Sequence, residues 1–217
     1  MTTRQADARA ITVTPATAAR WDDVVATFGT KGDPSWCWCQ YFATTGASYE
    51  KSAAANKDAL HGQVTARPST TRPAGLLAYR GREAVGWVQL GPIAAFPRVT
   101  GKARRTAALV SPSGDGAQPE NLWRVACFVV PPKQRRPGVA RALLDGAVAY
   151  ARDRGADALE AHPVDTGGKR VPGADLFHGV LSTVVAAGFE VIGRTATSRP
   201  IVPLDLTLPQ ASRPQAR

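Results

Sequence analysis

The stretch from Trp123 to Arg154 constrains the fold of this chain more than any other. It begins with a run of β-forming apolar residues, Val125–Val130, that is long enough for a buried strand and too short for a helix. Two prolines end the strand, because neither can donate to a ladder. A turn around Gly138 follows, and apolar residues then recur at helical spacing as far as Gly155. A buried strand, a tight turn and a helix start with free amides predict a cradle for an anion.

The turn is strongly cationic, which indicates that the anion is a phosphate group. Its pattern Arg135-x-x-Gly138-x-Ala140, placed between an apolar strand and a helix, resembles the acyl-CoA pyrophosphate loop of the GNAT superfamily of N-acetyltransferases. The alternative is an ordinary basic strand-to-helix turn in an α/β protein. The cationic residues of the turn are Lys133, Arg135, Arg136 and Arg141.

The remaining elements follow from periodicity and from turn residues. Thr14 is expected to cap a first helix that has Pro15 at its first position and ends at Gly29. We see no internal repeat and no domain linker. The other expected elements are a strand at 11–14, a helix from 48 to about 66, a hairpin of strands 75–79 and 84–90, a loop over 91–121, a strand at 158–164, a helix at 176–187, and strands at 190–195 and 201–208.

This order places one parallel strand pair, residues 125–130 beside residues 159–164, in an otherwise mostly antiparallel sheet. We therefore expect an α+β fold of three layers (α/β/α), with a mixed sheet and a splayed parallel pair at its centre, which is the topology that the GNAT resemblance implies. The resemblance is best over residues 123–195. It implies a single GNAT-like acyl-CoA N-acyltransferase domain over residues 1–217, with residues 1–10 and 209–217 as flexible tails.

Several further segments are similar to a bacterial branch of the same superfamily. They are the aromatic–cysteine patch at residues 35–42, the hairpin at 75–90, Cys127-Phe128 and residues 199–202.

Composition excludes some classes of protein. No apolar run approaches the roughly 20 residues of a membrane span, and the N-terminus lacks the apolar region of a signal peptide. Three cysteines make no disulfide framework, so we expect a cytoplasmic location. The net charge of +10 favours polyanionic partners, but the basic residues are dispersed. A small anionic cofactor fits that dispersion at least as well as nucleic acid does, and no membrane partner is expected.

The resemblance also implies how a cofactor would bind. In the superfamily the CoA pyrophosphate lies on the turn amides, and the pantetheine arm lies along the preceding strand, here beside Phe128 and Val130. Acetyl-CoA is therefore the expected co-substrate, and no metal is expected, because the Cys and His spacing matches no zinc site. The expected cofactor-binding residues are Phe128, Val129, Val130, Arg135, Arg136, Pro137, Gly138, Val139, Ala140 and Arg141.

Acetyl transfer to an amine needs the neutral amine, so a proton acceptor is expected. Glu160 and His162 lie two residues apart on one strand and therefore face the same side of the sheet. They are candidate catalytic residues, and the alternative is that both close a polar sheet edge. Glu120, just before the central strand, is a third candidate. The alternative is that Glu120 is a solvated loop carboxylate without a catalytic role. Many superfamily members use a tyrosine four residues before a Gly-Phe pair as general acid, but this chain has Val184 there.

The aromatic–cysteine patch lies where superfamily members line the acceptor site. Trp36, Trp38 and Tyr41 are therefore the expected substrate-binding residues, and core packing of the N-terminal helices is the alternative. Either no tyrosine acts as the general acid in this chain, or a tyrosine from elsewhere, such as Tyr41, takes that role. Cys127, in a buried strand, is expected to be an apolar filler.

Three functions fit these patterns. The favoured one is an acetyl-CoA-dependent N-acetyltransferase that moves an acetyl group directly to a primary amine of a small molecule or a protein lysine. The second is a CoA-binding regulatory module without catalysis, which the missing tyrosine supports. The third is a basic nucleic-acid-binding protein. The amine acceptor is not specified by the sequence, and a homodimer stays open.

Overall fold

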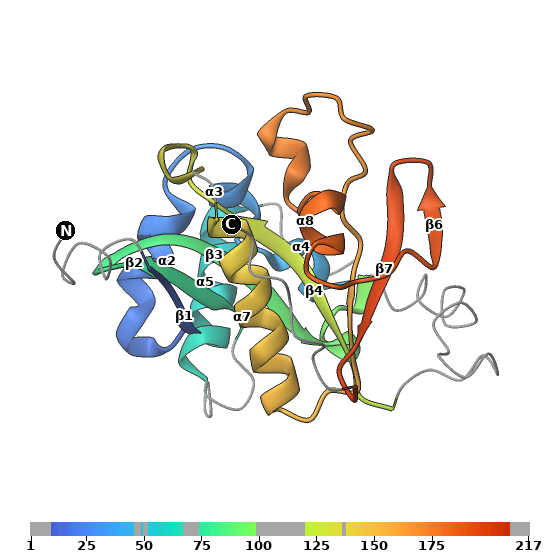
Figure 1. The fold of residues 1–217 in the computed structure, drawn as a ribbon. Helices are drawn as coiled ribbons and strands as arrows, with labels where there is room; N and C mark the ends of the chain where they lie inside the picture. Colours follow the sequence, from blue (N-terminus) through green and yellow to red (C-terminus); the bar gives the residue numbers. More distant parts are fainter. Residues whose placement is uncertain are drawn as a thin grey trace, which may run out of the picture.

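A mixed sheet of seven strands forms the centre of the protein, in the order β1-β2-β3-β4-β5-β7-β6 (Figure 1). The computed structural model describes residues 10–45, 49, 52–66, 74–98, 120–135 and 138–208. Neighbouring strands are antiparallel except β4 and β5, which are parallel. The strands are β1 (Ile11–Pro15), β2 (Leu76–Arg80), β3 (Glu83–Pro92), β4 (Leu122–Val129), β5 (Ala158–Ala161), β6 (Gly193–Ala196) and β7 (Arg199–Asp205).

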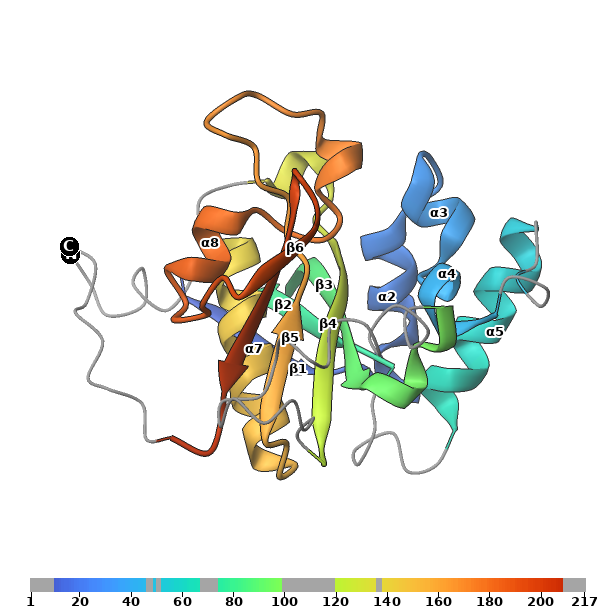
Figure 2. The ribbon, with the colours of Figure 1, turned by 90° about the vertical axis from the view of Figure 1, so that its right-hand side faces the viewer.

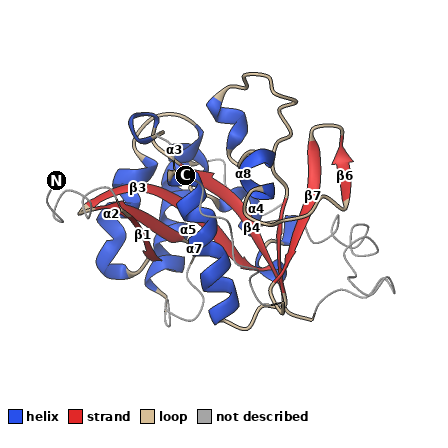
Figure 3. Ribbon diagram, in the orientation of Figure 1, coloured by secondary structure: helices blue, strands red, loops and turns tan. Residues whose placement is uncertain are grey.

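Helices cover both faces of this sheet, which confirms the predicted three-layer, mixed architecture (Figures 2 and 3). Figure 2 shows α7 and α8 on one face and the N-terminal helices on the other. Among the described residues, no helix has the length and apolar character needed to cross a membrane. The helices are α2 (Trp21–Phe28), α3 (Asp33–Cys37), α4 (Gln40–Ala43), α5 (Ala53–Thr65), α7 (Val139–Asp153) and α8 (Leu181–Val185), with short 3₁₀ turns η1 (Ala18–Arg20), η2 (Ile93–Ala95), η3 (Pro132–Gln134) and η4 (Gly173–Leu176).

Each face of the sheet carries its own apolar core. On one face, α7 buries a stripe that includes Leu143, Leu144 and Ala147 against the middle of the sheet. On the other face, Trp87 of β3 and Trp38 lie in a second core with residues of α2 and α5. The predicted helical spacing after the turn therefore reflects a real buried face of α7.

The parallel pair is shorter than predicted and opens into a V. Only Leu122–Arg124 of β4 pairs with Ala158–Glu160 of β5. The register against β3 shifts between Gln89 and Leu90, which makes Ala126 the extra residue of a β-bulge in β4. The predicted parallel pairing of these two strands is confirmed, but the paired residues are 122–124 and 158–160, and the rest of β4 has no ladder with β5. The apolar sequence of β4 does not indicate where a bulge forms, so the position of the bulge could not be predicted.

The first helix begins later than predicted. Thr14 and Pro15 are the last residues of β1, paired with Leu77 and Leu76, so they cap no helix. Pro15 is tolerated there because β1 is an edge strand. The helix α2 begins at Trp21, after η1.

The predicted helix over residues 176–187 is also wrong in its first half. Gly179 has a φ of +80°, a left-handed conformation that interrupts a helix. The chain therefore forms η4, then a turn that ends in the extended residue Val180, and then the five-residue α8. We call the segment Phe177–Val180 the wedge, because it lies between β4 and the continuation of β5.

The other expected elements agree with the structure to within a few residues. The helix α5 has Ser52 as its N-cap, whose hydroxyl accepts from the Ala55 amide at 3.4 Å. The hairpin corresponds to β2 and β3, and the last two strands to β6 and β7. The predicted helix start at Ser48, most of the 91–121 loop, and both predicted tails apart from residue 10 lie outside the described residues.

Candidate active site

A cleft of about 1840 Å³ lies at the C-terminal end of β4. Residues of α2, α3 and α4 line one wall, and η4, the wedge and α8 line the other. The end of β4, η3 and the first turn of α7 lie between the two walls. The predicted anion cradle and the predicted acceptor patch therefore both border one cavity.

The first turn of α7 presents free amides to this cleft. The first helical hydrogen bond runs from the Ala142 amide to the Gly138 carbonyl at 2.8 Å, so the amides of residues 139–141 have no acceptor within the helix. Among the described residues, no side chain caps this end of the helix, and the first turn carries no acidic residue. Gly138 precedes the helix with a φ of +101°, and Val139 and Ala140 line the cleft. Free amides and the positive end of the helix dipole form a site for an anion.

Two of the predicted cations lie beside these amides. Lys133 and Arg135 are exposed and line the cleft, and Arg135 donates through Nε to the Val130 carbonyl at 3.1 Å. Arg141 is engaged elsewhere, because its Nε pairs with Asp145 at 2.8 Å and its Nη1 donates to the Ala186 carbonyl at 3.0 Å. The predicted residues Arg136 and Pro137 lie outside the described residues.

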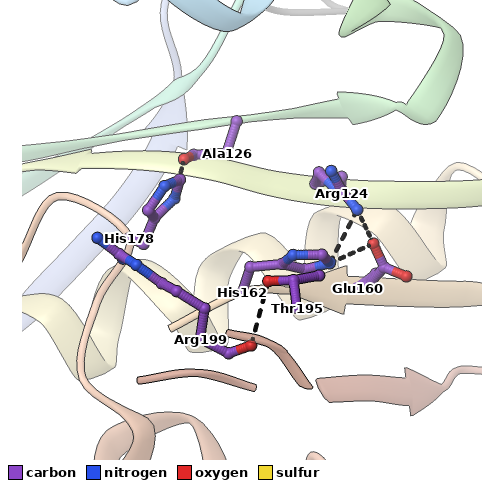
Figure 4. Close-up of polar contacts among 7 residues, drawn as sticks. All are labelled: Arg124, Ala126, Glu160, His162, His178, Thr195 and Arg199. Carbon is purple, nitrogen blue, oxygen red and sulfur yellow. Dashed lines mark hydrogen bonds and ion pairs between the residues drawn. The ribbon is translucent and has the colours of Figure 1, made fainter. Parts of the chain in front are cut away.

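The wedge occupies part of the open edge of β4. The Phe128 amide, expected to face a pantetheine arm, donates to the Phe177 carbonyl at 2.6 Å. The Ala126 carbonyl at the bulge accepts from Nδ1 of His178 at 3.0 Å (Figure 4). The N–H and C=O of one strand residue point the same way, so the Phe128 carbonyl also faces this edge, where it receives a weak contact from the Cys127 thiol at 3.8 Å.

The wedge is tied to the other arm of the V as well. The Val164 amide donates to the Gly179 carbonyl, and the Leu181 amide donates to the Val164 carbonyl, each at 2.9 Å. Phe177, Gly179 and Val180 line the cleft. The wedge therefore separates the cleft from the polar side chains behind it.

Three of those side chains form a hydrogen-bonded group at the base of the V (Figure 4). Glu160 is 1% exposed and pairs with Arg124, which is also buried, while Nε2 of His162 lies 2.8 Å from Glu160 and 2.9 Å from Arg124. Burial alone would raise the pKa of Glu160, but the hydrogen bond with His162 and the charge of Arg124 lower it to about 2. None of the three residues lines the cleft. Glu120, the third predicted base candidate, is exposed at the opposite end of β4 from the cleft.

Sequence reasoning missed Arg124, His178 and Arg199. Arg124 left one signal, a lone arginine at the start of an apolar strand. His178 packs against Phe177 at 4.3 Å between ring centroids and against Phe42 at 5.2 Å. Burial, and then the charge of Arg199, lower the pKa of His178 to about 3, so it is neutral at pH 7.

The three predicted acceptor residues divide between the cleft and the core. Trp36 and Tyr41 are 52% and 44% exposed and line the cleft. Trp38 is 4% exposed and stacks on Phe28 at 4.9 Å, which matches the core-packing alternative. Trp38 and Cys39 adopt φ values of 45° and 56°, so the link between α3 and α4 is left-handed and turns successive side chains to different sides.

The three cysteines are free and all line the cleft. Burial raises the pKa of the Cys37 thiol, and contact with Cys127 together with burial raises that of Cys39. Within the described residues, no three His, Cys, Asp or Glu side chains are grouped so as to hold a metal ion. Val184, at the superfamily's tyrosine position, is buried and lines the cleft.

Comparison with protein families decides the class of this site. The family model "Acetyltransferase (GNAT) family" matches residues 35–170, which is more than half of the chain. The chain belongs to the GNAT family of acetyltransferases. The matched region of this GNAT enzyme includes the end of β4, the first turn of α7 and the Arg124–Glu160–His162 group. The resemblance noted in the sequence is thereby confirmed.

Solved structures share the GNAT fold at low sequence identity. The GNAT domain of S. lividans PAT is 19% identical, with a TM-score of 0.51 over 89% of each chain. The PaiA N-acetyltransferase of Thermoplasma acidophilum, solved in complex with coenzyme A, is 12% identical with a TM-score of 0.51, over 90% of this chain and 99% of that one. A Drosophila melanogaster polyamine N-acetyltransferase is 16% identical with a TM-score of 0.51, over 90% and 100%. Among curated proteins, none matches this chain in sequence.

Proposed function

We propose that this protein, as one domain over residues 1–217, transfers an acetyl group from acetyl-CoA directly to a primary amine of a small molecule or a protein lysine. The observation that carries the proposal is the uncapped first turn of α7, whose free amides face a large cleft beside two exposed cations. The three free thiols fit a reducing compartment such as the cytoplasm.

The pyrophosphate of CoA fits the first turn of α7. The amides of residues 139–141 would donate to it, and Lys133 and the free nitrogens of Arg135 would add charge-assisted hydrogen bonds. The helix terminus itself contributes about 0.3–2 kcal/mol. The proposed cofactor site is the predicted set, Phe128, Val129, Val130, Arg135, Arg136, Pro137, Gly138, Val139, Ala140 and Arg141, of which Arg141 contributes its amide because its side chain is already paired.

The pantetheine arm has a narrower path than the sequence suggested. The Phe128 amide is bonded to the wedge, so the arm would use the Phe128 carbonyl and the backbone of Val130. An arm that reaches further along β4 has to displace the Phe177 carbonyl. The supporting observation is that Phe177, Gly179 and Val180 border the same cleft.

The chemistry is an attack of the neutral amine on the thioester carbon. A C–N bond forms, the C–S bond breaks, one amine proton leaves to a base, and the electron pair of the C–S bond goes to the CoA sulfur. An amine with a pKa of about 10.4 is mostly protonated at pH 7, so a general base is worth about 10²–10⁴-fold. Because CoA is a thiol with an unperturbed pKa near about 8.5, its thiolate can leave without a tyrosine acid.

We assign the base role to His162 within the Arg124–Glu160–His162 group. The wedge lies between His162 and the cleft, so this role requires the wedge to move away from β4. Glu160 is a poor proton acceptor because its pKa is held at about 2, and its hydrogen bond instead orients the imidazole. Glu120 is the remaining predicted base candidate, and Tyr41 is the predicted replacement for the tyrosine acid. Trp36 and Tyr41 at the cleft remain candidates for acceptor contacts.

The test measures CoA release from acetyl-CoA across amines, aminoglycosides and peptides, together with CoA binding. Gly138→Val imposes a side chain on a φ of +101° at the cradle, and Gly155→Val imposes one on a φ of +72° at the other end of α7. We expect Gly138→Val to abolish CoA binding and Gly155→Val to retain it. Equal CoA affinity in both variants would remove the cradle from the mechanism.

The CoA-binding module without catalysis is the second candidate. Val184 at the tyrosine position and the bonded Phe128 amide favour it. Tight CoA binding with no acetyl transfer to any amine in the same screen would decide for this candidate.

A further inference from the structure

Five side chains lie in the V between β4 and the strands β5 and β7. They are Arg124, Glu160, His162, His178 and Arg199, and we call them the splay cluster (Figure 4). The cluster contains two guanidinium groups and one carboxylate, and His178 is neutral at pH 7. Among these groups, the positive charge exceeds the negative charge by one unit.

Glu160 already has its partners, so the excess charge belongs to Arg199. The Glu160 carboxylate is paired with Arg124 and hydrogen-bonded with His162. Arg199 is half-buried, and within the described part of the chain its Nη1 is buried without a hydrogen-bond partner. Buried donors in proteins are nearly always hydrogen-bonded, and a buried charge without a partner is costly. The Arg199 guanidinium therefore has a buried donor that a bound anion would satisfy.

Arg199 lies immediately behind the wall of the cleft. Its guanidinium carbon is 5.9 Å from the centre of the Phe177 ring, and Phe177 lines the cleft. Figure 4 shows the guanidinium beside His178, which bonds to Ala126 at the bulge of β4. Arg199 is thus near the point where β4 leaves β5, and His162 is in the same V.

On the basis of the proposed acetyltransferase function, we propose that the acceptor is an amine that carries a carboxylate, and that Arg199 binds this carboxylate. The planar guanidinium matches a carboxylate with two parallel hydrogen bonds, which a neutral or dicationic amine cannot provide. The acceptor carboxylate would balance the charge of the splay cluster and orient the amine toward His162. The substrate class is therefore amino-acid-like amines rather than polyamines.

The test uses the full-length protein, acetyl-CoA and pairs of amines that differ only in a carboxylate: L-arginine against agmatine, and L-lysine against cadaverine. We expect a higher kcat/KM for the carboxylate-bearing member of each pair. Arg199→Gln should raise KM for that member by about 10- to 100-fold, change kcat much less, and remove the preference within the pair. Arg199→Lys keeps the charge without the planar fork and should retain part of the preference.

Arg194→Gln is the matched control. Arg194 lies on the neighbouring strand β6, is 41% exposed and pairs with Asp165, so this variant should keep the preference unchanged.

Equal or better turnover of agmatine and cadaverine would overturn the inference and leave the acetyltransferase proposal standing. A folded Arg199→Gln variant that keeps the preference would also overturn it. If Arg199→Gln does not fold, the wild-type pairs and Arg199→Lys decide. Failure to acetylate any amine would overturn both proposals together.

Discussion

Replacing Glu160 by Gln is expected to destabilise the fold at neutral pH and to remove part of its acid sensitivity. The carboxylate is 1% exposed and pairs with Arg124 and His162. Its pKa is about 2 in the folded protein against an ordinary value of 4.5. With about 1.4 kcal/mol for each pH unit, this difference corresponds to about 3 kcal/mol of stability.

The sign of the pH dependence follows from the lowered pKa. The contribution is present above pH 4.5, where the unfolded carboxylate is also ionised, and is lost as the pH falls from 4.5 toward 2. Glu160→Gln lacks this contribution at every pH and leaves Arg124 unpaired, a change that costs about 3–5 kcal/mol for buried pairs. The free energies of unfolding of the wild type and the variant should therefore converge in acid.

Urea unfolding at about pH 7 and about pH 3 measures this difference. Glu190→Gln removes an exposed carboxylate and should change the free energy of unfolding by less than about 0.5 kcal/mol at either pH. A deficit below about 1 kcal/mol for Glu160→Gln at pH 7, or the same deficit at both pH values, would refute the reasoning.

Three further predictions concern packing and the cleft. Gly146→Ala should destabilise the protein by about 1–3 kcal/mol, because the new Cβ would lie 2.5 Å from a valine methyl of β1. Gly62→Ala, where the new Cβ meets open space, should instead stabilise the protein by about 1 kcal/mol. Thermal unfolding of both variants measures the difference. Gly173→Ala places a Cβ against the guanidinium of Arg135, so calorimetry should show weaker CoA binding with unchanged melting temperature. Because burial raises the pKa of Cys37, its alkylation by iodoacetamide should be slow at pH 7 and should accelerate up to pH 9 and beyond. Bound CoA should suppress the alkylation, because Cys37 lines the cleft. Fast labelling that CoA does not change, followed by mass spectrometry, would contradict this prediction.

The parts of the fold that were predicted correctly are those with local signals. The hairpin and β4 are apolar runs bounded by turn residues, and α7 has an apolar stripe that persists over four turns. The errors arise where tertiary contacts decide. The bulge at Ala126 lies just beyond the last paired residue of the parallel ladder, and the contacts of the wedge hold Gly179 in a left-handed conformation within an otherwise helical pattern.

The candidate site divides in the same way. The strand, turn and helix around Gly138 were predictable because they are contiguous in the chain, and their role as an anion cradle stays a prediction. The splay cluster was only partly predictable, because Arg124, His178 and Arg199 come from three segments far apart in sequence. Trp38 was misplaced because the left-handed link between α3 and α4 turns its side chain into the core while Trp36 and Tyr41 line the cleft.

The wedge helps to hold together the two halves of the sheet, which meet at β4 and β5. β4 and β5 share only three paired positions, so the two halves of the sheet meet along a short ladder. The hydrogen bonds that the wedge makes to Phe128, Ala126 and Val164 extend the junction between the two halves, which we call the seam. Protection of the Phe128 and Val164 amides from hydrogen exchange should therefore report local opening of the seam at a lower free energy than global unfolding. A ligand that lies across the seam would slow exchange on both halves of the sheet at once.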